Sequence, residues 1–202
     1  MTDSDQELVR RCQQASGAAF EAAYRELYDL YSSRIYTICL RVTGNEEDAL
    51  DAAQETLVTL ARRIRDFAFR SRFSSWVFRI AVNAAIDVRR RRLAGQRGSV
   101  RTVLASGEAD PLADAAADPD RSDPLLDLEG RESVEMVRRA LASINPRFSS
   151  LLALRYMEGL SYEEIAEVLE CSLGTVKSRL NRAHAALREH LARRGEGPPA
   201  GG

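Results

Sequence analysis

Basic and hydroxyl side chains cluster in one helical stretch near the C-terminus, at residues 172–194. This stretch carries six basic groups and one acidic group, a net charge of +5. Its polar side chains nearest the expected helix start are Thr175, Lys177, Ser178, Arg179 and Arg182. Lysine and arginine neutralise phosphates, and arginine and serine can reach base edges in a major groove. The stretch therefore indicates DNA binding.

The segment 161–183 supplies the elements that would position these groups. Ser161 and Glu164 have the spacing of a capping box, which predicts a short helix ending near residue 169. A tight connection and a second helix, from about 173 to about 191, follow. The small residue Ala166 lets the two helices cross closely. This combination predicts a helix-turn-helix, and the alternative is a helical hairpin with a solvated basic face.

A second cluster mixes basic and aromatic side chains. Residues 62–101 carry twelve basic and two acidic groups, and the interleaved aromatics are Phe67, Phe69, Phe73, Trp76 and Phe78. Positive charge beside aromatic faces suits single-stranded nucleic acid. Helical register favours a core position for Trp76 and Phe78. The stretch 67–73 breaks the helical pattern, so we expect an exposed loop there. The basic run 89–92 could instead be a solvated helix end.

Acidic and amide groups line one face of a third segment. They are Asp48, Asp51, Gln54 and Glu55. The face could dock a basic partner, or it could be an ordinary polar helix face, and composition alone does not separate the two.

No constellation for catalysis is visible. Cys12, Cys39 and Cys171 lie far apart and form no C-x-x-C pair, so we expect small buried residues, with a redox role as the alternative. His184 and His190 lie in the basic helix and are expected at the surface. Phosphate-loop, nucleophile-elbow and zinc-protease motifs are absent. We therefore expect no enzyme, metal, cofactor or small-molecule substrate; a nuclease is a distant alternative.

The net charge of −1 over 202 residues conceals four charged blocks. They carry −6 (residues 1–61), +10 (62–101), −7 (102–130) and +2 (131–202). Such alternation suits a segmented protein with a stretch that faces a polyanion. The acidic N-terminus is unlike a signal peptide, and no stretch approaches the roughly 20 apolar residues of a membrane span. A cytoplasmic protein without direct membrane insertion is expected.

Helical periodicity runs through the chain, which predicts an all-α fold. Expected helices cover about 20–42, 45–66 and 74–92 in one unit, and 128–144, 146–158, 161–169 and 173–191 in another. We therefore expect two small helical domains, 1–93 and 131–192, the second a helix-turn-helix. Residues 94–130, rich in Asp, Gly, Ser and Pro, would be a flexible acidic linker, and 193–202 a disordered tail.

Two pairs of motifs now carry a family resemblance. Residues 48–57 (DALDAAQETL) and 73–90 (FSSWVFRIAVNAAIDVRR) resemble domain 2 of bacterial RNA polymerase sigma factors. Residues 160–169 (LSYEEIAEVL) and 174–183 (GTVKSRLNRA) resemble domain 4. With only these two domains, the chain resembles the extracytoplasmic-function (ECF) group. It departs at Leu50, a position that is usually acidic, and lacks the tryptophan pair of housekeeping sigma factors.

The resemblance implies a promoter-specificity subunit that directs transcription initiation with core RNA polymerase, through its β′ clamp and β flap. Polymerase contact falls to Asp48, Asp51, Gln54 and Glu55. Contact with the minus-ten element falls to Phe67, Arg70, Arg72, Phe73, Arg79, Asn83, Arg89 and Arg90. Contact with the minus-thirty-five element falls to Thr175, Lys177, Ser178, Arg179 and Arg182. Promoter DNA and an anti-sigma factor are the other implied partners.

The alternative function is a stand-alone helix-turn-helix regulator, whose N-terminal unit senses a ligand or dimerises. The basic-aromatic stretch 62–92 argues against it, because a sensor domain needs no DNA-facing surface. Two further hypotheses concern charge. As a DNA mimic, the acidic linker would shield the basic faces or thread along the RNA channel of the polymerase. The free protein would bind DNA poorly until polymerase separates the blocks.

Overall fold

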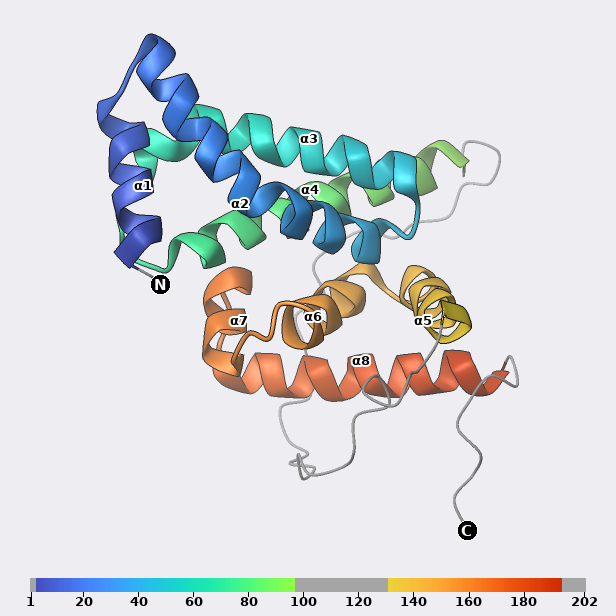
Figure 1. The fold of residues 1–202 in the computed structure, drawn as a ribbon. Coiled ribbons are helices and arrows are strands. Elements are labelled where there is room, and N and C mark those ends of the chain that lie inside the picture. Colours follow the sequence, from blue (N-terminus) through green and yellow to red (C-terminus); the bar gives the residue numbers. More distant parts are fainter. Residues whose placement is uncertain (1–2, 97–130, 194–202) are drawn as a thin grey trace.

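The computed structural model describes residues 3–96 and 131–193, and every regular element in these two ranges is helical. Eight α-helices form two layers (Figure 1), with α1–α4 above and α5–α8 below. The all-α prediction is confirmed. The expected linker 94–130 and tail 193–202 lie almost entirely outside the described residues, and the shielding hypothesis falls there too.

The upper layer contains four α-helices and one short 3-10 helix. They are α1 (Asp3–Gln14), α2 (Gly17–Thr43), α3 (Glu46–Arg63), the 3-10 helix η1 (Ile64–Asp66) and α4 (Phe73–Gln96). The long helices α2, α3 and α4 pack on one another around a shared apolar core. Helix α1 was not predicted. It buries Leu8, Val9 and Cys12 against this core.

Local sequence signals explain where α2 ends and α3 begins. The N–H of Gly44 donates to the carbonyl oxygen of Leu40 at 2.8 Å, and Gly44 has a φ of 71°, which glycine adopts without a steric penalty. The side chain of Asn45 then accepts from the Asp48 N–H at 3.0 Å. Acidic residues in the first turn of α3 and arginines in its last turn complement the helix dipole. The observed start of α3 at Glu46 agrees with the helix expected from about residue 45.

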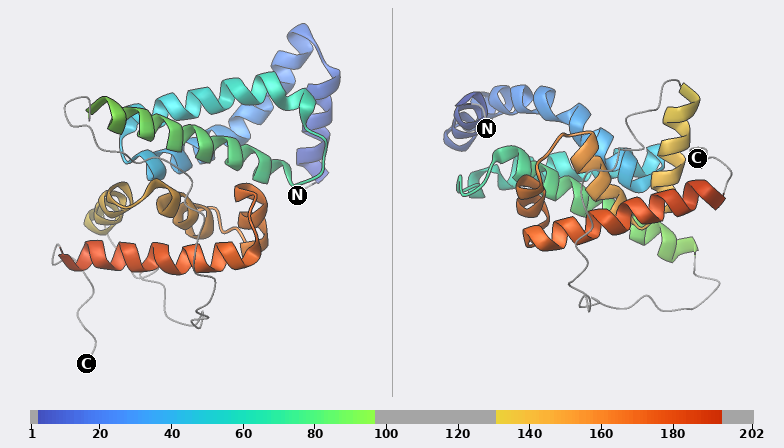
Figure 2. Two further views of the ribbon diagram at one scale, coloured as in Figure 1. Left: turned by 180° about the vertical axis from the view of Figure 1, so that it is seen from behind. Right: turned by 90° about the horizontal axis from the view of Figure 1, so that it is seen from below.

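The lower layer contains α5 (Arg131–Ser143), α6 (Pro146–Tyr156), α7 (Tyr162–Leu169) and α8 (Leu173–Arg193). Asn145 caps α6, and Pro146 takes its first position, where a missing N–H has no cost. The predicted capping box of α7 is present: Ser161 and Glu164 exchange hydrogen bonds at 3.1 and 2.7 Å. Helix α8 runs along the bottom of the layer (Figure 2) and packs on α5, α6 and α7.

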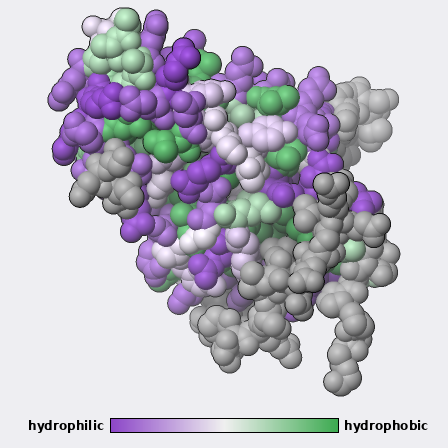
Figure 3. All heavy atoms as spheres, viewed as in Figure 1, coloured by the Kyte–Doolittle hydropathy of each residue, from purple (hydrophilic) through white to green (hydrophobic). Residues whose placement is uncertain are grey.

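The two layers are in direct contact. Helix α2 packs on α5 and α6, and α4 packs on α6 and α7. At Gly44 the layers approach so closely that a Cβ built there would lie 2.1 Å from the Cβ of Ala142. No helix in the described ranges is long and apolar enough to cross a membrane. The face seen in Figure 3 is mainly hydrophilic, with hydrophobic side chains in small separate areas.

Candidate nucleic-acid and polymerase interfaces

The loop between η1 and α4 is built around four aromatic rings. The ring centroid of Phe67 lies 5.0 Å from that of Phe69 and 5.3 Å from those of Phe73 and Trp76. Phe69 has a φ of 56°, a left-handed conformation that is strained for a bulky side chain. The guanidinium of Arg10 stands 5.5 Å from the Phe69 ring centroid. The loop is therefore a packed, strained structure rather than a loose connection.

The expected exposure of residues 67–73 was wrong for two of the three aromatics. Phe67 and Phe73 are buried, and Phe69 is partly buried. The reason is tertiary packing. Gln13 of α1 donates to the carbonyl oxygens of Ile64 and Phe67 at 2.9 and 2.8 Å, and Tyr31 of α2 packs its ring on Phe73. The core positions expected for Trp76 and Phe78 are confirmed.

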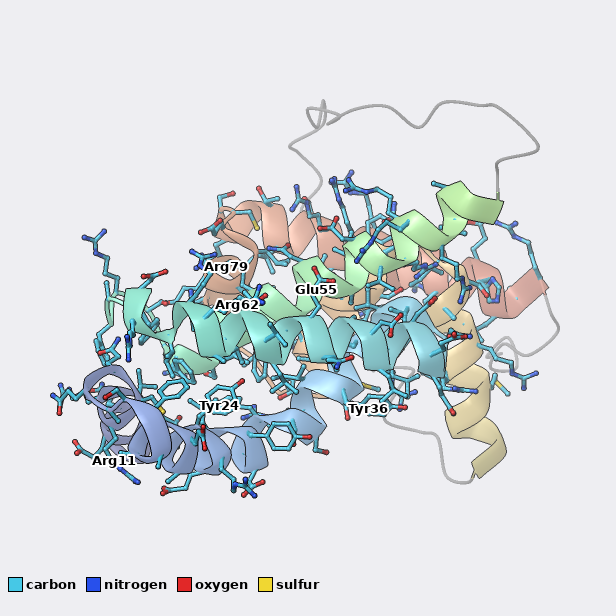
Figure 4. The ribbon with its side chains drawn as sticks, turned by 90° about the horizontal axis from the view of Figure 1, so that it is seen from above. Arg11, Tyr24, Tyr36, Glu55, Arg62 and Arg79 are labelled. Atoms are coloured by element: carbon cyan, nitrogen blue, oxygen red, sulfur yellow. The ribbon has the colours of Figure 1, made fainter. Side chains whose placement is uncertain are left out.

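The arginines assigned to the minus-ten element lie in different environments. Arg70 is exposed, and Arg90 is exposed with its guanidinium 3.0 Å from Asp87. Arg72 and Arg79 instead form ion pairs with Glu164 and with Glu170 at the end of α7. Figure 4 shows Arg79 on α4 beside the lower layer. Three of these four cations thus pair with carboxylates of the same chain, and two of the three carboxylates belong to the lower layer.

Arg89 is not on the surface. Its side chain is buried, and its guanidinium donates to the carbonyl oxygens of Val42, Ala142 and Ile144 at 2.7, 2.6 and 2.8 Å. These acceptors lie at the C-terminal ends of α2 and α5, where the helix dipoles are negative. Burial lowers the pKa of Arg89, and the charge of Arg92 adds to this. In the described arrangement this side chain joins the two layers and is inaccessible to a phosphate backbone, contrary to expectation.

The acidic face of α3 is largely open. Asp51, Gln54 and Glu55 are exposed, and Leu50 beside them is 60% exposed. Glu55, labelled in Figure 4, contacts Arg91 of α4 at 3.0 Å. The side chain of Asp48 is only 14% exposed and binds Arg92 at 2.7 Å. Asp48 therefore ties α3 to α4, while Asp51 and Gln54 face solvent.

Helices α7 and α8 form the helix-turn-helix. Ile165 and Val168 of α7 pack in the core with Val176 and Leu180 of α8. Glu170 ends α7 with a φ of 50°, which turns the chain sharply toward α8. Ser172 begins the second helix by accepting from the Thr175 N–H at 3.1 Å.

The five residues assigned to the minus-thirty-five element are all near the start of α8. Lys177 and Arg182 are exposed, whereas Thr175, Ser178 and Arg179 are partly buried. The Thr175 hydroxyl lies 2.8 Å from the Ser172 hydroxyl, and the Ser178 hydroxyl donates to the Thr175 carbonyl oxygen at 3.2 Å. Among these five residues, the exposed cationic side chains are Lys177 and Arg182, and Arg188 and Arg193 are exposed farther along the helix.

A cleft of about 290 Å³ between the layers brings parts of both DNA sites together. Arg79 and Asn83 of α4 line one side, and Arg179 of α8 and Arg147 of α6 line the other. The sequence did not predict this juxtaposition, nor the place of Glu170 in the lining of the cleft. A row of glutamates on α7 was visible in the sequence, but nothing there placed it against α4.

The cysteines behave as the sequence predicted at two of three positions. Cys12 and Cys39 are fully buried, and Cys171 is partly buried. Burial raises the pKa of each thiol, to about 12 for Cys39. His184 is partly buried, and its Nε2 lies 2.8 Å from the Tyr156 hydroxyl. Within the described ranges, no group of three potential metal ligands comes together.

Comparison with known proteins agrees with this division into two units. The family model of Sigma-70 region 2 matches residues 27–94, and the model of Sigma-70 region 4 matches residues 134–187. The first match covers α3, the aromatic loop and α4. The second covers the helix-turn-helix.

Relatives match along most of the chain. The ECF RNA polymerase sigma factor SigW of Bacillus subtilis (strain 168) is 30% identical over 178 residues, covering 84% of this chain and 89% of SigW. The ECF RNA polymerase sigma-E factor of Escherichia coli (strain K12) is 30% identical over 184 residues, covering 91% and 92%. The order and extent of both domains are therefore shared.

Two solved structures share the fold. CnrH, in complex with the cytosolic domain of CnrY, superposes with a TM-score of 0.65 at 21% identity, over 95% of this chain and 99% of that chain. The sigma factor RpoE of Bartonella quintana, in complex with the anti-sigma factor NepR, superposes with a TM-score of 0.59 at 22% identity, over 84% and 96%.

The fold and the two matched regions define a transcription initiation factor of the sigma-70 type. The chain belongs to the ECF group of RNA polymerase sigma factors. The function of such a protein is exercised with core RNA polymerase at promoter DNA, so the stand-alone regulator is not favoured.

Proposed function

We propose that this chain docks on core RNA polymerase through α3 and reads promoters at two places, with the aromatic loop and α4 at the minus-ten element and α8 at the minus-thirty-five element. It acts in the cytoplasm as a non-enzymatic subunit. The observation that carries the proposal is that three surface features with different chemistry lie on different parts of the chain. An open acidic face, a strained aromatic loop and a basic recognition helix lie on three different elements.

Docking on polymerase is assigned to the exposed side chains of α3. Asp51 and Gln54 face solvent, and Leu50 adds an exposed apolar contact where an acidic residue is usual. Charge complementarity steers such encounters, and a partly apolar centre strengthens them. Asp48, held by Arg92, positions the start of α3 rather than making the main contact.

Reading of the minus-ten element is assigned to the strained loop and to α4. Phe67 and Phe73 support the loop from below, and Phe69 is the aromatic nearest the surface. An unstacked base needs an aromatic face and a positive surround, and Arg10 and Arg70 supply charge there. Asn83 is exposed and offers hydrogen bonds to a base edge.

Reading of the minus-thirty-five element is assigned to α8. A recognition helix contacts base edges with its N-terminal residues. Lys177 and Arg182 are exposed in this part of α8, and Arg179 lies between them on the cleft side. The second domain would also contact the β flap.

An anti-sigma factor is proposed as the regulatory partner. The superposed structures of RpoE and CnrH contain a bound partner, which for RpoE is an anti-sigma factor. Small separate apolar areas on a hydrophilic face offer such a partner several anchoring points (Figure 3).

Run-off transcription with purified core polymerase tests this function. Product that depends on both the promoter and the chain is expected, and Asp51→Arg should abolish it by weakening core binding. Asp29→Arg, the same change at an exposed position of α2, should leave it intact. Tight sequence-specific binding to DNA by the chain alone, with no promoter-dependent product, would favour the stand-alone regulator instead.

A further inference from the structure

Helix α1 crosses the end of the upper layer, beside the segment that joins α3 to α4 (Figure 1). The side-chain nitrogen of Gln13 donates to the carbonyl oxygens of Ile64 and Phe67 at 2.9 and 2.8 Å. In return, Arg65 donates to the carbonyl oxygen of Ala15, just beyond α1, at 3.0 Å. An amide nitrogen carries two hydrogens, so both donors of Gln13 serve the point where η1 ends and the aromatic loop begins.

The loop that follows has a shape that its own backbone does not favour. Phe69 has a φ of 56°, and a bulky residue keeps such a conformation only where its surroundings impose it. Backbone hydrogen bonds hold the loop at its two ends, from the Phe67 N–H to Ile64 at 3.2 Å and from the Trp76 N–H to Arg72 at 3.1 Å. The amide from α1 reinforces the first of these ends, two residues before the strained position.

A second side chain on the same face of α1 meets the strained residue itself. Arg10 lies three positions before Gln13, which places the two on one side of the helix. Its guanidinium stands 5.5 Å from the ring centroid of Phe69, and the ring of Phe67 lies 5.0 Å from that centroid. One turn of α1 therefore contacts both the backbone that enters the loop and an aromatic ring within it.

Helix α1 is itself firmly bound to the rest of the layer. Leu8, Val9 and Cys12 are buried in the core. Arg11, labelled in Figure 4, donates to Glu26 of α2 at 2.7 and 2.9 Å. The loop is thus held from a regular element that belongs to the core, which is the kind of support that keeps a binding site in one geometry.

We infer that Gln13 is a positioning residue of the minus-ten site, which presets the aromatic loop in the shape that receives an unstacked promoter base. The inference rests on the proposed role of this loop in reading the minus-ten element. A loop held in its binding conformation loses little freedom when a base enters, and it separates one base from another because its contacts stand at fixed places. Gln13 acts through the backbone of the loop, and Arg10 acts through the ring of Phe69.

The fluorescence of Trp76, the only tryptophan of the chain, reports on the loop without DNA. Trp76 is buried, and its ring centroid lies 5.3 Å from that of Phe67. Gln13→Met keeps the side-chain length and removes both donors, so acrylamide should quench Trp76 about twofold more efficiently than in the full-length wild type. Gln13→Glu, which sets a carboxylate against two carbonyl oxygens, should have at least this effect. Gln14→Met, at the exposed neighbouring position, is the control and should match the wild type.

Transcription measures base preference. A promoter that the wild-type chain uses with core polymerase is randomised in its minus-ten element, or in its minus-thirty-five element in a parallel library, and each template carries a transcribed barcode. Gln13→Met should lower the preference for the favoured base at one minus-ten position or more by about fivefold, as expected for the loss of a hydrogen bond. The preference at the minus-thirty-five element and the affinity for core polymerase should stay unchanged, as should all three properties in Gln14→Met.

Unchanged quenching in both Gln13 variants would overturn the inference. So would a minus-ten preference that stays intact although Trp76 becomes accessible, because Gln13 would then have a purely structural role. A loss of preference or output at both elements alike would also overturn it. A wild type without any minus-ten preference would refute the proposed function, and the inference would fall with it. That failure is visible in the wild type alone, before any variant is compared.

Discussion

The guanidinium of Arg89 donates a hydrogen bond of 2.6 Å to the carbonyl oxygen of Ala142, although 53 positions separate the two residues. Arg89 lies on α4, which is assigned to the minus-ten element, and Ala142 lies at the end of α5 in the other layer. A side chain that the sequence places among DNA contacts thus serves in this form as a link between domains. A basic side chain of this protein thus binds backbone groups of the same chain, whereas others are proposed to bind its partners.

Removing this link should loosen the two layers. Arg89→Met keeps most of the aliphatic volume and deletes the donors to three buried carbonyl oxygens. We expect the free energy of unfolding to fall by about 2 kcal/mol, because unsatisfied buried acceptors cost about 1–3 kcal/mol. Urea denaturation followed by circular dichroism measures this. The control Arg90→Met, at an exposed position, should change stability by less than about 0.5 kcal/mol. Equal effects of the two changes would contradict the role of Arg89.

The approach of Gly44 to Ala142 gives a second prediction. Gly44→Ala adds both left-handed strain and a steric clash, since its Cβ would lie 2.1 Å from the Cβ of Ala142. Gly17→Ala, at a φ of +56° with nothing within 4 Å, adds the strain alone. Strain of this kind costs about 1–2 kcal/mol. Thermal unfolding should show a distinctly larger destabilisation for Gly44→Ala, and a difference within error would mean that the layers do not approach at this point.

Acid should weaken the cap of α7 and the contact with α4. The hydrogen bond from the Ser161 N–H, and to a lesser degree the Arg72 guanidinium, lower the pKa of Glu164 below its ordinary value of 4.5. Because the pKa is lower in the folded state, the stabilisation is complete above about pH 4.5 and is lost as the pH falls through the lowered value. Urea titrations between pH 6 and pH 3 should therefore show a shallower loss of stability in Glu164→Gln than in wild type. Glu189→Gln is the control, and it should follow the wild-type curve.

The three thiols should differ in reactivity. Burial raises the pKa of Cys39 to about 12, and Cys12 is also fully buried, so neither should react with iodoacetamide at pH 8 in the native protein. Cys171 is partly exposed, lines an open cleft with Arg79, and should be alkylated first. Mass spectrometry of the modified peptides measures this order. Rapid native labelling of Cys39 would show that the upper core opens readily.

Helices were predictable where local signals were strong. The helices expected from residues 45, 146 and 161 begin within one residue of these positions. Asn45, Asn145 with Pro146, and the Ser161–Glu164 capping box mark these starts, because such signals act over one turn of the chain. Helix α1 was missed, since its polar start hides a short apolar stripe. The basic helix α8 and the acidic face of α3 were also predicted as structural features, because the spacing of polar residues shows which side of a helix is exposed.

Properties that depend on the other layer or on distant helices were not predictable. Phe67 and Phe73 lie in a stretch that breaks the helical pattern, and their burial depends on tertiary contacts that include Tyr31 of α2 and Gln13 of α1. Arg89 stands in a run of four arginines, and nothing local distinguishes the one whose acceptors come from α2 and α5. The pairing of α7 with α4 joins positions about 90 residues apart, so it emerges only in three dimensions.

Mapping the 5′ ends of transcripts made on a fragmented genomic template by core polymerase, with and without this chain, tests the central claim most directly. The account predicts new start sites that require the chain and that share two upstream sequence elements at fixed distances. Lys177→Ala with Arg182→Ala should reduce dependence on the farther element while leaving core binding intact. Start sites that are identical with and without the chain, or that share no upstream element, would contradict it.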